Sequence, residues 1–467
     1  MISLDKDWKA KASPKQATKS EGARIEATVD LRCLESLKSE WVALFERIEG
    51  PSACASYDWI ASWWEAFGQA AEGAGKETHL FVLSIRNPSG ELVGIVPLYE
   101  ELPADWTQMR RLRLIGDLGH DGVFGMTEEP TLLIAQGWDE FVLDAVAQEL
   151  RQGVESGRWD FVTFRVLRDG ETCPLRKAFG HLSSKTWLKT DQRSGSDYAE
   201  LPTDWAEYRK SLSKSMRDNL GYYPRLLTRD GHDWEVRYVR DSCDVAEAAT
   251  RLTELHRARA TSQRGLHHCN HLAGTPHENF LSTLLSRLAE QDKAFIAELV
   301  VDGEVIASQA FIENKGELTV FYSGYLDGWY KYSPIFVIDT VVFRDAMERG
   351  VRRLDFLRNS SQWKTRWGTQ PGAPLRRATL VAKRPVAALR YAIYFGEQLV
   401  RRNLTERMPV IQHRVDRRLR TAMASLTARF GQATRALLPL APVVSRHATR
   451  MAPSLHLAVR LMPLHHH

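Results

Sequence analysis

The residues best suited to chemistry gather around a tyrosine-rich segment that ends in a Ser-Pro pair at Ser333 and Pro334. Four tyrosines precede this pair: Tyr322, Tyr325, Tyr330 and Tyr332. A phenol can protonate a leaving group, and aromatic faces can line a pocket. Serine followed by proline is typical of a helix start, whose free N–H groups can bind a phosphate. The alternatives are tyrosines that only pack and a helix that binds nothing.

Acid–base chemistry has further candidates. His256 lies in a stretch with helical spacing, and histidine titrates near neutrality, so it could act as a base. Asp327 could accept a proton, and Asp355, on a predicted strand, could orient a basic group or a substrate amine. The structural alternatives are a packed helix histidine, a turn-forming aspartate and an ion pair.

Two regions of the chain predict the same order of elements. Residues 80–99 and 295–313 each indicate two strands joined by a tight turn that contains Gly-Glu. A predicted helix precedes each hairpin, at 57–67 in the first copy and at 277–290 in the second. A second helix and then a strand follow each hairpin, at 139–155 and 159–166 in the first copy and at 334–349 and 354–359 in the second. The order indicates a mixed α/β sheet domain that occurs twice.

The predicted repeat divides the chain into five segments. They are a disordered N-terminus at 1–24, an N-terminal domain at 25–202, a connecting helix at 203–230, a C-terminal domain at 231–383 and an arginine-rich helical tail at 384–467. The connecting helix is dense in charge, with Lys210, Lys214, Arg217 and Arg225. These cations could line a cleft for an anionic substrate, or simply form a solvated helix face.

The tail is strongly basic. Residues 384–467 contain 14 arginines, three acids and no lysine, a net charge of +11, which leaves −6 for the rest of the chain. Apolar residues recur at helical spacing between Val415 and Phe430, which predicts an amphipathic helix. It could dock on the protein body, lie on an anionic membrane surface or bind nucleic acid. The lack of a nucleic-acid motif disfavours the last.

Composition narrows the class further. Apolar residues make up 43% and no uncharged apolar run reaches 18 residues, which excludes a membrane-spanning helix. The polar, lysine-rich start predicts a cytoplasmic protein, at most peripheral on the inner face of the membrane. Five scattered cysteines offer no disulfide framework. Three histidines and a cysteine at 267–271 are too closely spaced for ordinary chelation, so we expect no metal.

Several segments together resemble the GNAT-fold acyltransferases of the cellulose-biosynthesis-cluster and Fem-like kind, which have two tandem GNAT domains. They are KSLSKSMRDNL at 210–220, LHRAR at 255–259, FYSGYLDGWYKYSP at 321–334, RRLDFLRN at 352–359 and WKTRWG at 363–368, with YDWIASWWEAFG at 57–68 and GELVGIVPLY at 90–99 in the first copy. The resemblance covers about residues 25–383. It departs at Ile335, where relatives commonly have glycine.

The resemblance implies roles for individual residues. In this fold a cofactor pyrophosphate is expected at Ser333, the donor being acetyl-CoA or a longer acyl-CoA. Donor contacts are expected from Lys331, Tyr332, Ser333, Lys364 and Trp367. Catalysis is expected from Tyr325 as the acid, because the pattern places it at a strand end where the two reactants should meet. Asp327, His256 and Asp355 are further candidates. Substrate contacts are expected from Lys214, Arg217 and Arg257.

The expected activity is acyl transfer from a thioester to an amine of a cell-envelope or exopolysaccharide precursor. Acyl-carrier protein could replace CoA as the donor. One rival is a Fem-like transferase that uses aminoacyl-tRNA, and another is a non-catalytic scaffold recruited through the basic tail. Replacement of the family's glycine by Ile335 favours the scaffold.

Overall fold

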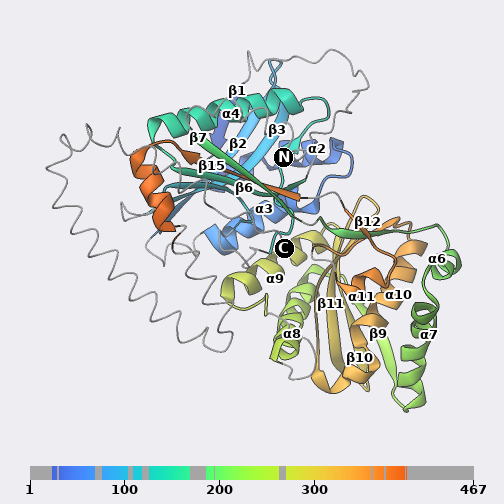
Figure 1. The fold of residues 1–467 in the computed structure, drawn as a ribbon. Coiled ribbons are helices and arrows are strands. Elements are labelled where there is room, and N and C mark those ends of the chain that lie inside the picture. Colours follow the sequence, from blue (N-terminus) through green and yellow to red (C-terminus); the bar gives the residue numbers. More distant parts are fainter. Residues whose placement is uncertain are drawn as a thin grey trace, which may run out of the picture. The chain divides into compact units, whose positions relative to one another are not determined.

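The computed structural model describes residues 24–28, 31–68, 76–103, 109–117, 126–168, 186–193, 195–261, 270–358, 361–372, 375–394 and 396. The described residues from Arg24 to Ala388 belong to one compact unit, and residues 389–394 and 396 to another. The first unit contains two sheets with their helices (Figure 1), which we call the first lobe and the second lobe. Most of the basic tail and the 265–269 histidine segment lie outside the described residues, and residues 385–394 are helical.

The first lobe is built on a sheet of eight strands among the described residues. Its order is β1 (Arg24–Thr28), β2 (Lys76–Arg86), β3 (Leu92–Pro103), β4 (Arg111–Leu114), β6 (Phe161–Arg168), β15 (Leu375–Ala382) and β7 (Thr186–Arg193), with β5 (Leu133–Ile134) also paired to β3. The pair β4 and β6 is parallel, and α4 (Asp139–Ser156) crosses between them. Such a parallel pair of strands requires a crossover connection. Here the crossover contains α4, which packs its apolar face onto the sheet.

Local sequence explains the turns of this lobe. In the β2–β3 hairpin, Asn87 Oδ1 accepts the backbone N–H groups of Ser89 and Glu91, while Gly90 has φ +87°. Helix α4 ends at Gly157, in the left-handed conformation that favours glycine. One turn earlier Gly153 leaves room for the buried Trp159 ring, since an added Cβ would lie 2.0 Å from it.

The second lobe is built on a sheet of seven strands within the described part of the chain. Its order is β14 (Gln370–Pro371), β8 (Asp197–Glu200), β13 (Arg353–Asp355), β12 (Glu317–Tyr325), β11 (Glu304–Asn314), β10 (Ala294–Val301) and β9 (Trp234–Val239). Strands β12 and β13 are parallel, and α10 (Pro334–Glu348) connects them. The two lobes therefore share one arrangement: antiparallel strands followed by a parallel pair with a helical crossover.

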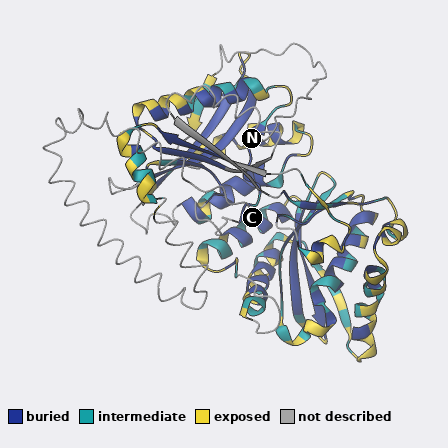
Figure 2. Cartoon of the chain, viewed as in Figure 1, coloured by how far each residue is buried: buried dark blue, intermediate teal, exposed yellow. Residues whose placement is uncertain are grey.

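Helices cover both faces of the second sheet. Alternate residues of β10 divide between two cores: Ile296 packs in the core that includes α8 (Ser242–Thr261) and α9 (Thr275–Ala289), whereas Phe295 packs in the core of α7 (Lys214–Arg229) and α10. This division follows from the two-residue period of a strand. Figure 2 shows both sheets as largely buried and the helices as mixed.

The predicted repeat is confirmed in its elements. The two hairpins correspond to β2–β3 and β10–β11, and the helices that precede them to α3 (Tyr57–Trp63) and α9. Helices α4 and α10 lead into β6 and β13, as expected. In the first copy α3 continues as a π-helical turn, η2 (Trp64–Gly68), which the sequence pattern did not predict. The fold is a mixed α/β structure with two mixed sheets.

The sheets do not follow the boundaries that we expected from the sequence. Strand β8 lies before residue 202 but joins the second sheet, and β15 lies near the end of the expected second domain but joins the first. Each lobe thus receives one strand from the other side of the sequence boundary. The expected single connecting helix is two helices, α6 (Trp205–Ser211) and α7, because Ser213 caps α7 by accepting the Met216 N–H.

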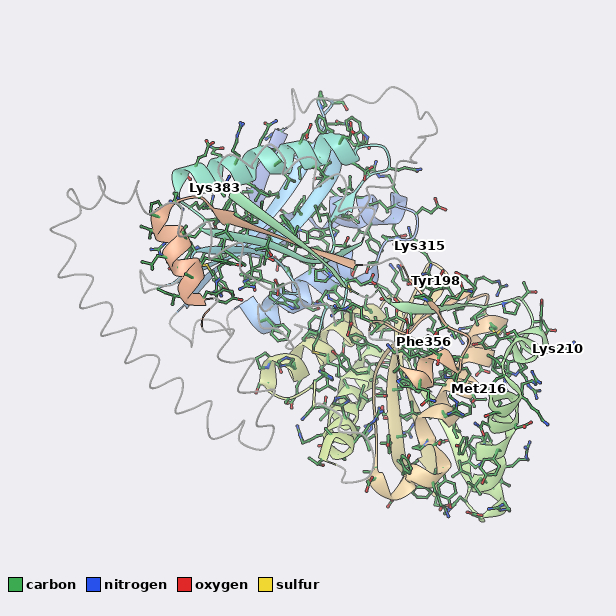
Figure 3. All side chains as sticks on the ribbon, in the orientation of Figure 1. Tyr198, Lys210, Met216, Lys315, Phe356 and Lys383 are labelled. Carbon is green, nitrogen blue, oxygen red and sulfur yellow. The ribbon has the colours of Figure 1, made fainter. Side chains whose placement is uncertain are left out.

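The lobes share part of their core. Trp59 of α3 contacts Phe280 of α9 and Phe321 of β12, with ring centroids 5.7 Å apart in both pairs, and its Nε1 donates to Thr127 Oγ1 at 2.8 Å. Lys315, which is labelled in Figure 3 and lies in the β11–β12 turn, donates to carbonyl groups at the end of α2 (Lys38–Arg47). The first lobe therefore supports the strand β12 directly.

No helix among the described residues combines the length and the apolar character that crossing a bilayer requires. The smaller elements of the chain are α1 (Leu31–Ser36), η1 (Ala53–Ala55), η4 (Asp327–Tyr332) and α11 (Gln362–Thr365). Of these, η4 is important for the site because it joins the end of β12 to the start of α10.

Candidate active site

The candidate site begins where the two parallel strands of the second sheet separate. Strand β13 pairs with β12 from Glu317↔Arg353 to Thr319↔Asp355, and there β13 ends. Strand β12 continues to Tyr325 with β11 as its partner and, in the described part of the chain, no strand on its other side. We call residues 320–325 the open edge. An open edge offers unpaired backbone groups to a ligand.

A bulge distorts the open edge. Gln309 of β11 pairs with Ser323, but Phe311 pairs with Val320, so β12 contains an extra residue at this point. A bulge re-aims side chains and leaves backbone groups unpaired. Consistent with this, the neighbours Phe321 and Tyr322 both pack on the core that includes α8 and α9, although consecutive strand residues normally face opposite ways.

Helix α8 lies directly against this bulged strand. A Cβ added to Gly324 would lie 2.2 Å from the backbone nitrogen of His256, so only glycine allows this approach. His256 Nδ1 donates to the Ser323 carbonyl at 2.8 Å, and Nε2 accepts the His271 N–H at 3.3 Å. Both ring nitrogens are thus engaged, and the histidine positions the open edge. To act as a base it would first have to break one of these bonds.

Two further side chains meet at the end of the open edge. Arg259 of α8 donates to Ser323 Oγ at 3.1 Å, and its guanidinium lies 5.2 Å from the centre of the Tyr325 ring. Burial raises the pKa of the Tyr325 phenol, although the nearby Arg259 opposes this rise. The phenol is therefore protonated at neutral pH and can donate a proton. Tyr325 lies at the strand end, as the sequence predicted.

Two buried polar residues lie beside this group and were missed by the sequence analysis. Asp339 of α10 is 2% exposed and Gln309 of β11 is 1% exposed. The Gln309 side chain hydrogen-bonds to the Asp339 carboxyl, and Arg259 acts on the same carboxyl through its charge. Burial nevertheless raises the pKa of Asp339 well above its ordinary value. A lone acid on the otherwise apolar face of α10 is the signal that could have identified it.

The start of α10 follows the open edge after η4. Pro334 occupies the first helical position, as predicted. Ser333 precedes it in the left-handed conformation, with φ 48° and ψ 59°, and its side chain makes no capping bond, which corrects our expectation of a serine cap. The N–H groups of Ile335 and Phe336 lie in the first turn, where a helix supplies no acceptor of its own, and both residues are partly exposed. This turn fits a phosphate group despite the isoleucine.

The expected donor contacts Lys331 and Tyr332 are engaged within the protein. Lys331 Nζ and the Tyr332 hydroxyl both donate to Asp230 Oδ2, each at 3.1 Å. His232 bonds to the Tyr332 hydroxyl at 3.0 Å and to Asp302 Oδ2 at 2.7 Å. The Lys331 ammonium chiefly lowers the pKa of Asp230. The network anchors η4, while Lys331 itself remains exposed to solvent.

Lys364, Trp367 and Asp355 also make contacts inside the protein. Lys364 Nζ donates to the carbonyls of Leu357 and Arg358 at 3.1 and 2.6 Å, and burial lowers its pKa. Trp367 is 1% exposed and stacks on Phe336 with ring centroids 5.1 Å apart. Asp355 Oδ1 accepts the Leu357 N–H at 2.8 Å. This placement differs from the expected ligand contacts, because all three side chains stabilise the turn after β13 or the core.

The expected substrate contacts lie on other surfaces. Arg217 donates to the Leu212 carbonyl at 2.5 Å, and Arg257 pairs with Glu278 at 3.0 Å. Lys214 is exposed at the first residue of α7. Among the contacts of the described residues, none joins these three side chains to Tyr325. Asp327, by contrast, is partly exposed two residues beyond Tyr325 and acts on its phenol through its charge.

The described residues contain no group of three histidine, cysteine or acidic side chains arranged to hold a metal. The sequence cluster with three histidines falls mostly outside them, since only Asn270 and His271 of that segment are described.

Comparison with known proteins identifies the second lobe. Residues 214–365, from the first residue of α7 to the last of α11, match the family described as "Acetyltransferase (GNAT) domain". No curated protein matches the chain. The crystal structure of FemX is similar in fold, with a TM-score of 0.50 and 10% identity over 75% of this chain and 98% of that one.

Two other solved structures are more distant. L-PGS from Bacillus licheniformis has a TM-score of 0.42 and 12% identity over 78% of this chain and 96% of that one. A tandem GNAT protein from the clavulanic acid biosynthesis pathway has a TM-score of 0.41 and 12% identity over 78% of this chain and 99% of that one. The family match covers the open edge, the crossover helix and the separating strands, so residues 214–365 are a GNAT domain of the acyltransferase type.

Proposed function

We propose that the second lobe transfers an acyl group from acyl-CoA to an amine of a cell-envelope or exopolysaccharide precursor. The observation that carries the proposal is the bulged open edge of β12, which ends beside the free first turn of α10 within a GNAT domain. One element offers backbone groups to an acyl carbonyl, and the other offers N–H groups to a pyrophosphate.

The donor supplies an activated carbonyl carbon: as the amine nitrogen bonds to it, the C–S bond breaks, the amine loses a proton and the thiolate gains one. The N–H groups of Ile335 and Phe336 hold the pyrophosphate. The Tyr325 hydroxyl gives its proton to the thiolate, because burial keeps the phenol protonated. Asp327, which is open to solvent nearby, receives the amine proton through water.

Other expected residues support these groups rather than touch the reactants. His256 fixes the bulged strand through the Ser323 carbonyl, and Lys364 and Asp355 fix the turn where β13 leaves the sheet. Lys214, Arg217 and Arg257 remain predictions for contact with an anionic acceptor. The basic tail remains a proposed contact with an anionic membrane surface that carries the acceptor.

The test is calorimetric titration of the full-length protein with CoA and with acetyl-CoA. A Ser333→Trp variant should lose saturable binding, because the indole would cover the first turn of α10. Ser36→Trp, which places the same bulk on an exposed residue of α1, should bind like the unchanged protein.

Binding that survives Ser333→Trp would remove the donor from the start of α10. If folded protein binds neither ligand, an acyl-CoA donor is excluded. The remaining donors are then acyl-carrier protein and aminoacyl-tRNA, each of which can be tested by acyl transfer to a soluble amine. A scaffold would fail in all of these assays.

A further inference from the structure

Two buried oxygen atoms in the second lobe have no hydrogen-bond partner in the described part of the chain: Asp339 Oδ1 and Gln309 Oε1. Both side chains are almost completely buried, at 2% and 1% exposure. A buried polar atom without a partner loses its hydration and gains nothing in return, so proteins rarely retain one without a reason. Here two such acceptors belong to side chains that are hydrogen-bonded to each other.

The pair lies next to the proposed reaction centre. Gln309 is the strand partner of Ser323, the open-edge residue whose hydroxyl accepts from Arg259. Asp339 faces the same side of the sheet from α10, one turn after the helix start that we propose for the pyrophosphate. Thus the two oxygens lie one strand inward from the open edge, between the elements that would hold the two ends of the donor.

Apart from Arg259 and Ser323, the pair lies among residues of an apolar core. Residues Val337, Ile338 and Phe311 belong to the same core and are fully buried. Among the described residues no group hydrogen-bonds to the two oxygens, whereas a ligand group that enters from the open edge would. Gln309 Oε1 can only accept a hydrogen bond, so the group that matches it must donate one, and a carboxyl oxygen of Asp339 can accept from the same group.

We propose that Asp339 and Gln309 determine acyl-group specificity, and that the acyl chain transferred by this domain carries a hydroxyl or amino group that donates to their free oxygens. The proposal rests on the proposed function, since it assigns the acyl chain to the α10 side of the open edge. A plain acetyl or fatty acyl group would leave both oxygens without a hydrogen-bond partner. A site built to bind a group that donates a hydrogen bond rejects the analogue that lacks this group. A terminal carboxylate has no hydrogen to donate to Gln309 Oε1.

The test compares thioesters that differ by one hydroxyl group. The full-length protein is titrated with butyryl-CoA and 3-hydroxybutyryl-CoA, with propionyl-CoA and lactoyl-CoA, and with CoA itself. We expect at least one hydroxylated member to bind about tenfold tighter than its partner. CoA contains no acyl group, so its affinity measures the remainder of the donor site.

Two variants test whether the pair receives the hydroxyl group. Asp339→Leu and Gln309→Leu each remove a free acceptor at similar volume, and each should abolish the preference while CoA binds as before. If one variant does not fold, the other and the unchanged protein still give the comparison. Asp339→Asn, which keeps one acceptor oxygen, should retain part of the preference.

Three outcomes would overturn the inference. Equal affinity within both thioester pairs, with normal CoA binding, would refute the specificity and leave the proposed function intact. A preference that survives both leucine variants would assign the hydroxyl group to other residues. No binding of CoA at all would refute both the inference and the proposed function.

Discussion

The two lobes have the same strand order around their parallel pairs, yet one buried polar group near each pair is partnered differently. In the first lobe, β4 is paired with β6 as far as Arg113↔Thr163 and ends one residue later. The fully buried Arg113 lies between Glu101 and Asp117, 3.3 Å from each. In the second lobe β12 runs past its partner, and the buried Asp339 is left with a free oxygen.

The difference fits a first lobe that supports and a second lobe that carries out the proposed reaction. Charges that neutralise one another inside a sheet stabilise the fold but leave little for a ligand. Acceptors left without partners are costly for the fold and useful for recognition. The contact of the first lobe with the open edge runs through Trp59, whose ring packs against Phe321 in the bulge of β12, so under the proposed function this lobe would act on the reaction indirectly.

The largest expected effect is on stability in the first lobe. Arg113→Leu removes the buried cation that pairs with Asp117 and that shares Glu101 with Arg111, so we expect a loss of about 3–5 kcal/mol in the free energy of unfolding. Arg259→Leu, the matched change in the second lobe, removes a bond to the Ser323 hydroxyl and a cation over the Tyr325 ring, and it should cost less, about 1–3 kcal/mol. Urea denaturation measures both. Equal losses would remove the distinction between the lobes.

An intermediate effect is expected on catalysis. Tyr325→Phe should lower kcat about 100-fold, since it removes the proposed proton donor, and should leave stability nearly unchanged. Because burial raises the pKa of this phenol above 10, its acid form persists to higher pH than in free tyrosine. The rate of the unchanged enzyme should thus decline only above pH 10 on account of this group. Tyr330→Phe, an exposed neighbour, is the control, and a similar loss there would count against the assignment.

The smallest expected effect concerns the network that holds η4. Asp230→Asn removes the carboxylate that competes for the Lys331 ammonium, so a nearby donor phosphate should attract this cation more strongly. We expect CoA to bind several-fold tighter at low salt, with the gain disappearing at high salt. Asp302→Asn, which changes the far end of the same network, should leave CoA affinity unchanged. A gain in both variants would indicate loosening of η4 instead.

Periodicity in the sequence was enough to predict the repeated hairpins and helices, because strands such as β10 and helices such as α10 combine clear apolar patterns with clear turn residues. The exchange of β8 and β15 between sheets could not be predicted, since it depends on pairing between residues far apart in the chain. The bulge in β12 likewise depends on its register with β11.

Side-chain roles were harder to predict than elements. Tyr325 was placed correctly at a strand end, because the turn signal at Leu326-Asp327-Gly328 marks that end. Lys364 and Trp367 were predicted to contact ligand, but residue type does not say whether a side chain points inward. Asp339 and Gln309 were missed for the opposite reason. Their apolar neighbours in the sequence indicated the hydrophobic core, and residues assigned to the core were not considered as candidates for the site.

The exchanged strands also constrain how the chain can be made. Strand β15 is the hydrogen-bonded neighbour of both β6 and β7, so neither can complete its pairing in the first sheet until residue 382 has left the ribosome. Roughly 200 residues separate β6 from β15, which at typical elongation rates is on the order of 10–40 s of synthesis. During that interval the first sheet exposes incomplete edges, and an exposed edge invites pairing with other chains. The edges of the first sheet in the nascent protein are therefore covered only after β15, the last of its described strands, has been synthesised.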